Sequence, residues 1–171
     1  IEVYKKLSVL RHNNLVSVYD AKGEDGSCLV IEEFINGSTI ADNLAKALYT
    51  EKQVVSIISS LCDALYALHS NGIIHRDIKP ENIIIDLNGT LKLIDFNASR
   101  SYKHYQPRDT QVMGTIGFAS PEQFGESQTD ARSDIYAVGI LINVMLTGRH
   151  PSAELHQGKL RKIIQKCIQP V

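Results

Sequence analysis

The chain has 171 residues, of which 43% are hydrophobic and 22% are charged, and its formal net charge is −1. This composition is sufficient for a packed core, and the near-zero charge argues against a general electrostatic attraction to nucleic acid or to a membrane. Three cysteines stand far apart without a Cys-x-x-Cys motif, so neither a zinc knuckle nor a disulfide framework is indicated. No apolar run could cross a bilayer and no signal peptide opens the chain, so a cytoplasmic location is expected.

The first part of the chain predicts a helix followed by a β-hairpin. Residues 2–11 carry apolar side chains at helical spacing and predict a short amphipathic helix. Residues 15–20 alternate apolar and polar, as a half-buried strand does, and the turn signals in 22–26 join them to a second strand at 28–34. Residues 36–38, Asn-Gly-Ser, are expected to interrupt that strand.

Thr39 is expected to cap a short helix, and residues 51–70 predict a long amphipathic helix that ends at Asn71-Gly72. Residues 73–74 form a short predicted strand. The expected buried face of the long helix consists of Val54, Val55, Ile58, Leu61, Leu65 and Leu68.

The remaining elements are a hairpin, a loop and two helices. The apolar segments 82–85 and 91–94 flank an Asn-Gly pair, which is a strong hairpin signal. Residues 99–112 are polar without periodicity and predict a loop, whereas 133–147 are apolar nearly all round and predict a buried helix. Residues 159–168 predict a last amphipathic helix, whose apolar face would carry Leu160, Ile163, Ile164 and Cys167.

The chemistry of the chain is concentrated in residues 75–82, which are His-Arg-Asp-Ile-Lys-Pro-Glu-Asn. Asp77, Lys79 and Asn82 lie within six positions, and Asp95-Phe96 follows thirteen residues after Asn82. This set suits the binding of metal-bound phosphates beside a hydroxyl that must lose its proton. A lone aspartate in a turn is usually a cap or an Asx-turn, but these spacings together favour a catalytic site.

The two motifs resemble the catalytic loop and the metal-binding segment of eukaryotic-type (Hanks-type) serine/threonine protein kinases. The order of the other segments agrees with this resemblance over essentially the whole chain. It implies an α+β, protein-kinase-like fold, mainly the α-helical large lobe with a truncated small-lobe β-sheet. Residues 1–35 would be a remnant of the small lobe, with helix C, its last two strands and the hinge, and 36–171 an incomplete large lobe. The segments that carry the resemblance are Glu32–Ile35 with Gly37, Asp95–Asn97, Gly114-Thr115, Ser120–Glu122 and Ser133–Tyr136.

The resemblance implies ATP and Mg²⁺ as cofactors and assigns the catalytic roles. Asp77 would accept or orient the proton of the attacking hydroxyl, and Lys79 would neutralise charge on the transferred phosphoryl group. Asn82 and Asp95 would hold magnesium, which favours hard oxygen ligands. Thr115 would brace Asp77 and Lys79.

The resemblance also assigns nucleotide-binding and supporting residues. Backbone groups of Glu33 and Ile35 would hydrogen-bond adenine, Ile84 would underlie its ring, and Glu81 would belong to the nucleotide-binding set together with Lys79, Asn82 and Asp95. His75 and Phe96 would stack as struts, and Asp134 would anchor the catalytic loop from below.

Lys79 and Gly114-Thr115 favour a protein substrate with a serine or threonine acceptor. Residues 121–123 and 129–134 resemble bacterial members of the family. Arg76 has two open interpretations. It could bind a phosphorylated loop residue, Ser101, Thr110 or Thr115, of which Thr110 is preferred, or it could pair with a loop carboxylate.

Several residues depart from the family pattern. Asn97 replaces the usual glycine, and the helix C glutamate is expected at Val3, unless a one-residue insertion restores Glu2. Residues 151–160 are too few for the usual substrate-docking helix. The glycine-rich loop and its partner lysine would precede Ile1, so the chain is expected to be an inactive fragment of an active kinase that lacks its small-lobe segment.

Two alternatives stay open. The first is a non-catalytic, kinase-like module that binds a nucleotide or a partner protein, and the second is a phosphotransferase for small molecules. No nucleic-acid or membrane contact is expected from this segment. Self-association is expected through the strand edges at 15–20 and 28–34.

Overall fold

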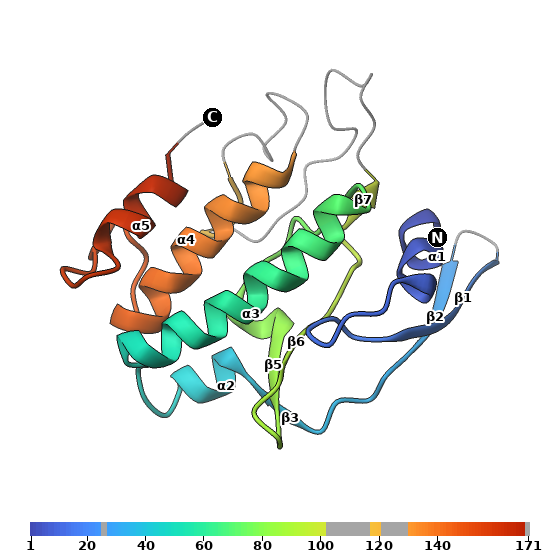
Figure 1. Cartoon of the computed structure of the whole chain (residues 1–171), viewed down its shortest axis with the longest axis horizontal. Helices are drawn as coiled ribbons and strands as arrows, with labels where there is room; N and C mark the ends of the chain where they lie inside the picture. Colours follow the sequence, from blue (N-terminus) through green and yellow to red (C-terminus); the bar gives the residue numbers. More distant parts are fainter. Residues whose placement is uncertain (25–26, 102–116, 121–129, 170–171) are drawn as a thin grey trace.

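The computed structural model describes residues 1–24, 27–101, 117–120 and 130–169. Figure 1 shows a small unit, made of one helix and a β-hairpin, beside a larger helical unit in which three helices lie side by side. This arrangement confirms the predicted α+β class, with most of the chain in the helical part. None of the helices in the described ranges is both long and apolar enough to span a membrane.

The small unit consists of α1 (Glu2–Val9), β1 (Val18–Glu24) and β2 (Ser27–Glu32), and the two strands pair antiparallel. The predicted start of the first strand at residue 15 is wrong. Leu15 and Val16 are both buried, so they do not alternate as a half-buried strand would. Leu15 instead forms an isolated parallel bridge with Leu93, and the Val16 N–H donates to the Leu93 carbonyl at 3.0 Å. These contacts fasten the small unit to the larger one.

The connection between the units contains β3 (Gly37–Thr39) and α2 (Ile40–Leu44). The second strand of the hairpin ends before residues 36–38, as predicted, but Gly37 also begins an unpredicted strand, in which it pairs with Asp86 in β5 (Ile83–Asp86). A Cβ atom at Gly37 would collide with the carbonyl oxygen of Ile85, so only glycine allows this close approach. The predicted cap is confirmed, since Thr39 forms a capping box with Asp42.

The long predicted helix is α3 (Glu51–Ser70), which Thr50 and Gln53 begin with a second capping box. Its buried face consists of Val54, Leu61, Ala64, Leu65 and Leu68. Val55, which was expected on this face, is 49% exposed, whereas Ala64 lies in the core. The helix ends at Asn71, and Gly72 takes the left-handed conformation with φ of 66°, as predicted.

Short strands surround the catalytic loop. β4 (Ile73–Ile74) pairs with β7 (Arg100–Ser101), so the prediction of a loop from residue 99 is wrong at these two residues. The rest of that predicted loop lies outside the described residues. β5 and β6 (Leu91–Leu93) form the predicted hairpin, whose turn contains Gly89 with φ of 82°.

The last two helices are α4 (Ala131–Thr147) and α5 (Arg161–Cys167). α4 is buried along most of its length, as predicted, and Asp130 caps its start. Gly139 allows α5 to pack closely, because a Cβ atom there would lie 2.6 Å from Cβ of Cys167. Only part of the predicted face of α5 is confirmed: Ile164 is fully buried, but Ile163 is 51% exposed.

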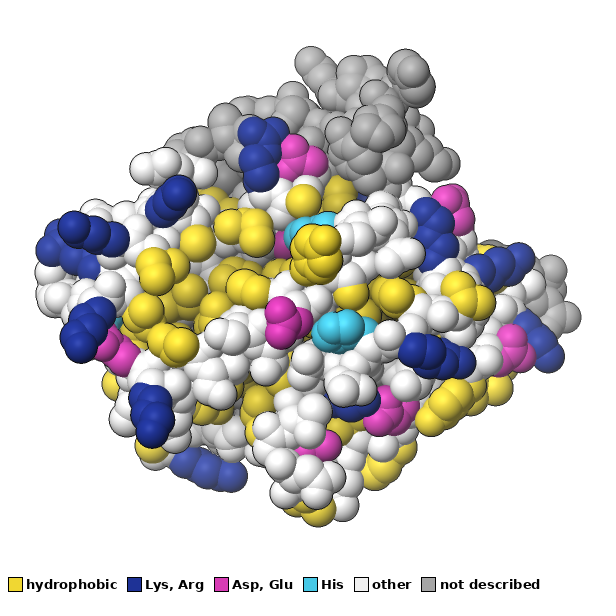
Figure 2. All heavy atoms as spheres, in the orientation of Figure 1, with side chains coloured by type: hydrophobic (Ala, Val, Ile, Leu, Met, Phe, Trp, Pro, Cys, Tyr) yellow, Lys and Arg dark blue, Asp and Glu magenta, His cyan; other side chains and the backbone are white. Residues whose placement is uncertain are grey.

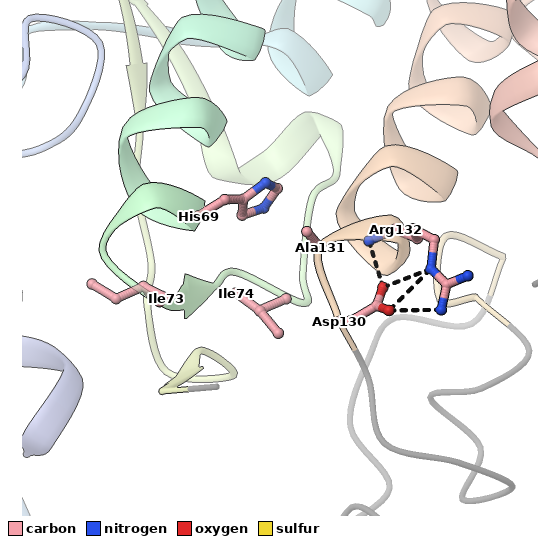
Figure 3. Close-up of a pocket in the computed structure, with 7 residues that line it drawn as sticks. His69, Ile73, Ile74, Asp130, Ala131 and Arg132 are labelled. Atoms are coloured by element: carbon pink, nitrogen blue, oxygen red, sulfur yellow. Dashed lines mark hydrogen bonds and ion pairs between the residues drawn. The ribbon is translucent and has the colours of Figure 1, made fainter. Parts of the chain in front are cut away.

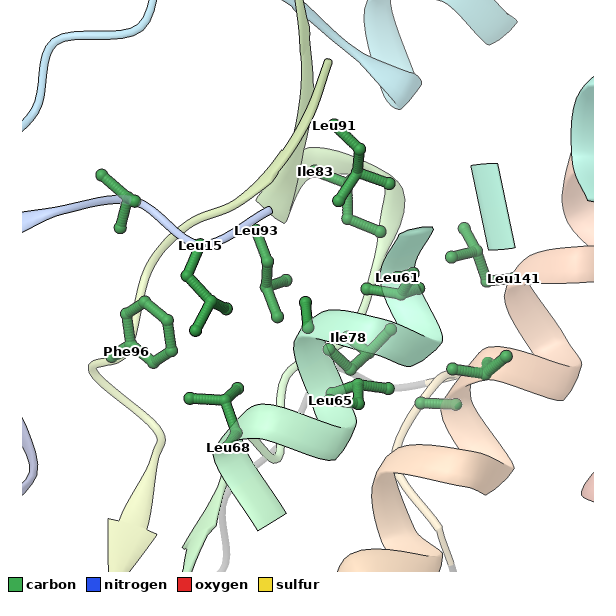
Figure 4. Packing of buried hydrophobic residues seen from close by; sticks show 14 of the residues in the cluster. Leu15, Leu61, Leu65, Leu68, Ile78, Ile83, Leu91, Leu93, Phe96 and Leu141 are labelled. Carbon is green, nitrogen blue, oxygen red and sulfur yellow. The ribbon is translucent and has the colours of Figure 1, made fainter. Parts of the chain in front are cut away.

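One hydrophobic core supports both units and the site (Figure 4). Leu15 from the small unit, Leu61 and Leu65 from α3, and Leu141 from α4 all belong to it. Ile78 of the catalytic loop is also part of this core and is fully buried. Figure 2 shows basic side chains dispersed over the visible face rather than gathered in one patch.

Candidate active site

The catalytic loop follows β4. In it, the functional residues Asp77 and Lys79 lie on either side of the buried Ile78 in the sequence. Asp77 Oδ2 and Lys79 Nζ form an ion pair at 2.8 Å, with side chains that are 13% and 20% exposed. Because Ile78 points into the core, its two neighbours are held on the other side of the loop. The Asp-x-Lys spacing therefore places a carboxylate and an ammonium group next to each other at the surface of a rigid core.

Asn82 orients the carboxylate of Asp77. Its Nδ2 donates to the backbone carbonyl and to Oδ2 of Asp77, both at 2.9 Å. This pattern commits the amide nitrogen of Asn82 and leaves Oδ1 as the group that can coordinate a cation. The 3₁₀ turn Pro80–Asn82 presents the residue, and the Ile94 N–H donates to the Asn82 carbonyl at 3.0 Å. Ile94, the residue before the Asp95-Phe96 motif, is therefore hydrogen-bonded directly to the catalytic loop.

Asp95 lies in a strained left-handed conformation, with φ of 63°. Such a backbone costs on the order of 1–3 kcal/mol for a residue other than glycine, and it is typical of functional sites. Its Oδ1 accepts from the Asn97 N–H at 3.1 Å, which holds the carboxylate locally. Arg76 is the other non-glycine residue of the described chain with positive φ, at 69°, and it also lies in the site.

His75 and Phe96 link the two motifs through their rings. The ring centroids are 5.0 Å apart, so the predicted contact is confirmed, but the rings meet edge to face instead of stacking. Nδ1 of His75 accepts from the Asp77 N–H at 3.3 Å, so Nε2 carries the proton and donates to the Ile94 carbonyl at 3.2 Å. Burial lowers the pKa of His75 below its usual value despite the charge of nearby Asp134, which keeps the imidazole neutral.

Asp134 anchors the loop from below, as the sequence predicts. This fully buried carboxylate accepts from the His75 N–H at 3.0 Å and from the Arg76 N–H at 2.7 Å. His69 Nε2 lies 2.7 Å from the same carboxylate. Asp134 also lies in the first turn of α4, where the helix dipole favours a negative charge.

A cavity of about 250 Å³ lies beside this anchor, between the end of α3, β4 and the start of α4 (Figure 3). Asp130 and Arg132 form a bidentate ion pair at its rim, with the shortest distance 2.7 Å. His69 and Ile74 line the same cavity. The cavity therefore reaches His69, the side chain that contacts Asp134, while Asp134 itself is fully buried.

The hinge is fixed by a charged contact that the sequence analysis missed. The Glu33 N–H donates to the Ser17 carbonyl at 2.8 Å, while its carboxylate accepts from Lys92 Nζ at 2.9 Å. Burial alone would raise the pKa of Glu33, but the bonds from Lys92 and Ser17 outweigh it and leave the pKa below its usual value. Ile35 packs against the core, and its N–H bonds to none of the described residues, so it can serve a ligand.

The predicted site residues do not all come together. Asp77, Lys79 and Asn82 contact one another directly, whereas Asp95 is linked to them through Ile94, whose N–H donates to the Asn82 carbonyl. Ile84 lies in β5 between β3 and β6. Glu81 is exposed and instead lines a cavity of about 450 Å³ whose other walls include Leu44, Phe118 and His150.

Thr115, Gly114, Thr110 and the segment after Ser120 lie outside the described residues, so their predicted roles stay predictions. Ser101, another predicted phosphorylation site, is buried in β7. Both interpretations of Arg76 also stay predictions.

α1 contributes a tyrosine where the family pattern expects a glutamate nearby. Val3 and Tyr4 are both buried, and Glu2 is exposed. The Tyr4 hydroxyl donates to Asn97 Oδ1 at 2.9 Å. Burial, followed by the charges of Asp95 and Glu32, raises the pKa of Tyr4 to about 12. The sequence signal for this contact was the asparagine in place of glycine, but nothing in the sequence pointed to its partner.

The donor set fits magnesium shared with phosphate. Within the described ranges, no group of three or more His, Cys, Asp or Glu side chains is placed to hold a metal ion. Mg²⁺ is commonly bound by one or two protein carboxylates together with substrate phosphates and water. Asn82 Oδ1 and the Asp95 carboxylate supply such a partial set.

Comparison with known proteins shows the family of the chain. Residues 1–170 match the family model for the protein kinase domain. The chain is 36% identical to serine/threonine-protein kinase PrkC of Bacillus subtilis over 146 residues, which cover 84% of this chain and 22% of PrkC. It is 35% identical to serine/threonine-protein kinase PknB of Mycobacterium tuberculosis over 152 residues, covering 84% of this chain and 24% of PknB. It is also 39% identical to serine/threonine-protein kinase PknL of the same organism over 149 residues, covering 84% and 37%.

The chain therefore belongs to the protein kinase family, as its motifs predict. It spans between 22% and 37% of the length of these relatives, all of which come from bacteria. The resemblance to bacterial serine/threonine kinases is confirmed.

The lowered pKa of His75 predicts a pH dependence of folding. Below the unfolded-state value of about 6.5, the unfolded chain binds a proton that the folded imidazole refuses, so stability falls as the pH falls. This contribution changes the free energy of unfolding by at most about 1.4 kcal/mol per pH unit. His75→Phe should flatten the curve between roughly pH 6.5 and 5, as measured by urea unfolding.

Phe96→Leu is the matched control, because it weakens the same ring contact without removing a titrating group. It should lower stability at every pH and keep the slope of the parent chain. Equal slopes in His75→Phe and the parent would contradict the assignment of a neutral buried imidazole.

Proposed function

We propose that this chain is the large lobe, with an adjoining small-lobe segment, of a kinase that transfers the γ-phosphoryl group of ATP to serine or threonine hydroxyls of proteins. Residues 1–35 are assigned to the small lobe and 36–171 to the large lobe. The observation that carries the proposal is the Asp77–Lys79 ion pair, with Asn82 bonded to the same carboxylate oxygen. The printed names of the relatives, serine/threonine-protein kinases, support the acceptor class.

The proposed chemistry depends on positioning rather than on covalent catalysis. Asp77, fixed through Oδ2, accepts or orients the proton of the acceptor hydroxyl. Lys79, which pairs with Asp77 in the free chain, neutralises charge on the phosphoryl group during transfer. Magnesium bound with ATP would supply further charge neutralisation, and Asn82 and Asp95 would hold it. Glu33 and Ile35 offer backbone groups to adenine, above Ile84.

The 171 residues contain no Gly-x-Gly-x-x-Gly loop, which in kinases covers the ATP phosphates. Poorer positioning of the phosphates would lower the rate by on the order of a thousandfold. We therefore assign activity to the larger protein and little activity to this chain alone. A second candidate, a non-catalytic nucleotide-binding module, is favoured by Val3 at the expected glutamate position and by Asn97 in place of glycine.

The test is transfer of radiolabelled phosphate from ATP, with magnesium, to a generic serine/threonine protein substrate. We expect the larger protein that supplies the small-lobe segment to be active. Asp77→Asn in that protein should lower kcat by at least about a hundredfold, because it removes the proton acceptor. Asp63→Asn, which changes an exposed carboxylate on α3, should leave kcat unchanged.

Unchanged activity in Asp77→Asn would show that Asp77 is not the proton acceptor. An inactive larger protein that still binds ATP would favour the non-catalytic module instead.

We also propose that this chain self-associates through the β1–β2 hairpin and the hinge. Leu29 and Ile31, 66% and 51% exposed, lie on one face of a two-stranded sheet, and Phe34, 91% exposed, follows it. Within the described residues each strand of this sheet pairs only with the other, so its outer edge is a template for pairing with another chain. Light scattering should show a mass that rises with concentration, and the double variant Leu29→Ser, Ile31→Thr should stay monomeric.

The matched control for this experiment is Leu87→Ser, which removes an apolar side chain that is 77% exposed at the β5–β6 turn. It should associate as the parent chain does. A monomeric parent chain at every concentration would refute the proposal.

A further inference from the structure

The most informative contact outside the catalytic loop joins α1 to the metal-binding segment. Tyr4 and Asn97 are 93 residues apart in the sequence, yet the Tyr4 hydroxyl donates to Asn97 Oδ1 at 2.9 Å. The Tyr4 side chain is only 8% exposed, so its direction is fixed by packing. The hydrogen bond therefore links a well-packed side chain of the small unit to Asn97 in the larger unit.

Asn97 passes this restraint to Asp95. The Asn97 N–H donates to Asp95 Oδ1 at 3.1 Å, while its side chain is held by Tyr4. Asn97 itself is exposed, and among the described residues its side chain has no other hydrogen-bond partner. Tyr4 thus determines where the side chain of Asn97 lies, and the backbone of the same residue contacts the carboxylate proposed to bind metal.

The surroundings show why such a restraint matters. Tyr4, Asn97, Asp95 and Glu32 line one cavity of about 280 Å³. Two carboxylates, those of Glu32 and Asp95, share this cavity, and their like charges repel each other. Asp95 also has a strained φ of 63°, and strained residues persist only where neighbouring contacts hold them. A glycine at position 97 would provide the backbone donor but could not bind Tyr4.

We propose that Tyr4 is a positioning residue, which through Asn97 holds the Asp95 carboxylate in the orientation that binds a metal–nucleotide complex. This inference rests on the proposed function and adds a residue to its site. It also couples the place of α1 to metal binding, because a displacement of α1 breaks the Tyr4–Asn97 bond. Residues that act only by packing would not produce this coupling.

The test measures binding of ADP with Mn²⁺ as the metal probe, by water-proton relaxation in the full 171-residue chain. A second titration measures ADP alone in the presence of a chelator. Tyr4→Phe should weaken binding of the Mn²⁺–ADP complex about fivefold, the typical value of one hydrogen bond, and leave binding of ADP alone unchanged. Tyr66→Phe, which removes an exposed hydroxyl on α3, should change neither titration.

A double-mutant cycle separates positioning from packing. Asn97→Gly should weaken the Mn²⁺–ADP complex, and adding Tyr4→Phe to it should cause no further loss, because the bond is already absent. Equal losses with and without metal in Tyr4→Phe, additive losses in the cycle, or no loss at all would overturn the proposal.

Asp95→Asn separates the proposed role of Tyr4 from the proposed metal site. If Asp95→Asn abolishes the metal-dependent gain in affinity and Tyr4→Phe has no effect, only the role of Tyr4 is refuted. If Asp95→Asn binds Mn²⁺–ADP as the parent does, or the parent shows no metal-dependent binding, the metal site of the proposed function and the role of Tyr4 are both refuted.

Discussion

The site depends on one buried carboxylate, Asp134. Burying an unpaired charge costs several kcal/mol, so this side chain must be satisfied by donors. Its donors are the adjacent backbone N–H groups of His75 and Arg76, with His69 as a third partner. Arg76, the second of these donors, has φ of 69°, a strained conformation for a residue other than glycine. The strain of that conformation is offset by charge-assisted hydrogen bonds.

The proposed catalytic residues are connected to Asp134 through His75. His75 contacts Asp77 through Nδ1 and Ile94 through Nε2, so its neutral ring fixes the start of both motifs. Asn82 then orients the Asp77 carboxylate. The remaining carboxylate, Asp95, depends on contacts from farther away, since its restraint passes through Asn97 to Tyr4. The catalytic loop is thus held mainly from within the large unit, and the metal-binding segment partly from the small one.

Local rules predicted much of this structure from the sequence. The cap at Thr39, the helix end at Gly72 and the turn at Gly89 depend on short-range interactions, which the order of the residues reveals. The sequence did not predict features that depend on contacts between segments far apart in the chain. Leu15 forms a bridge with Leu93 instead of belonging to the predicted strand. Gly37 lies in an unpredicted strand, because β5 approaches it closely.

The same division applies to the candidate site. The spacing of Asp77, Lys79 and Asn82 was sufficient to predict that they lie together, because all three belong to one loop. Tyr4 and Lys92 were missed, since each acts across the fold on a residue far away in the sequence.

Native-state hydrogen exchange at individual amides shows whether Asp134 holds the catalytic loop rigid. If it does, the amide hydrogens of His75 and Arg76 should exchange within about tenfold of the rate of Leu141, in the interior of α4. Exchange at the rates of an unprotected loop, while Leu141 stays protected, would contradict it.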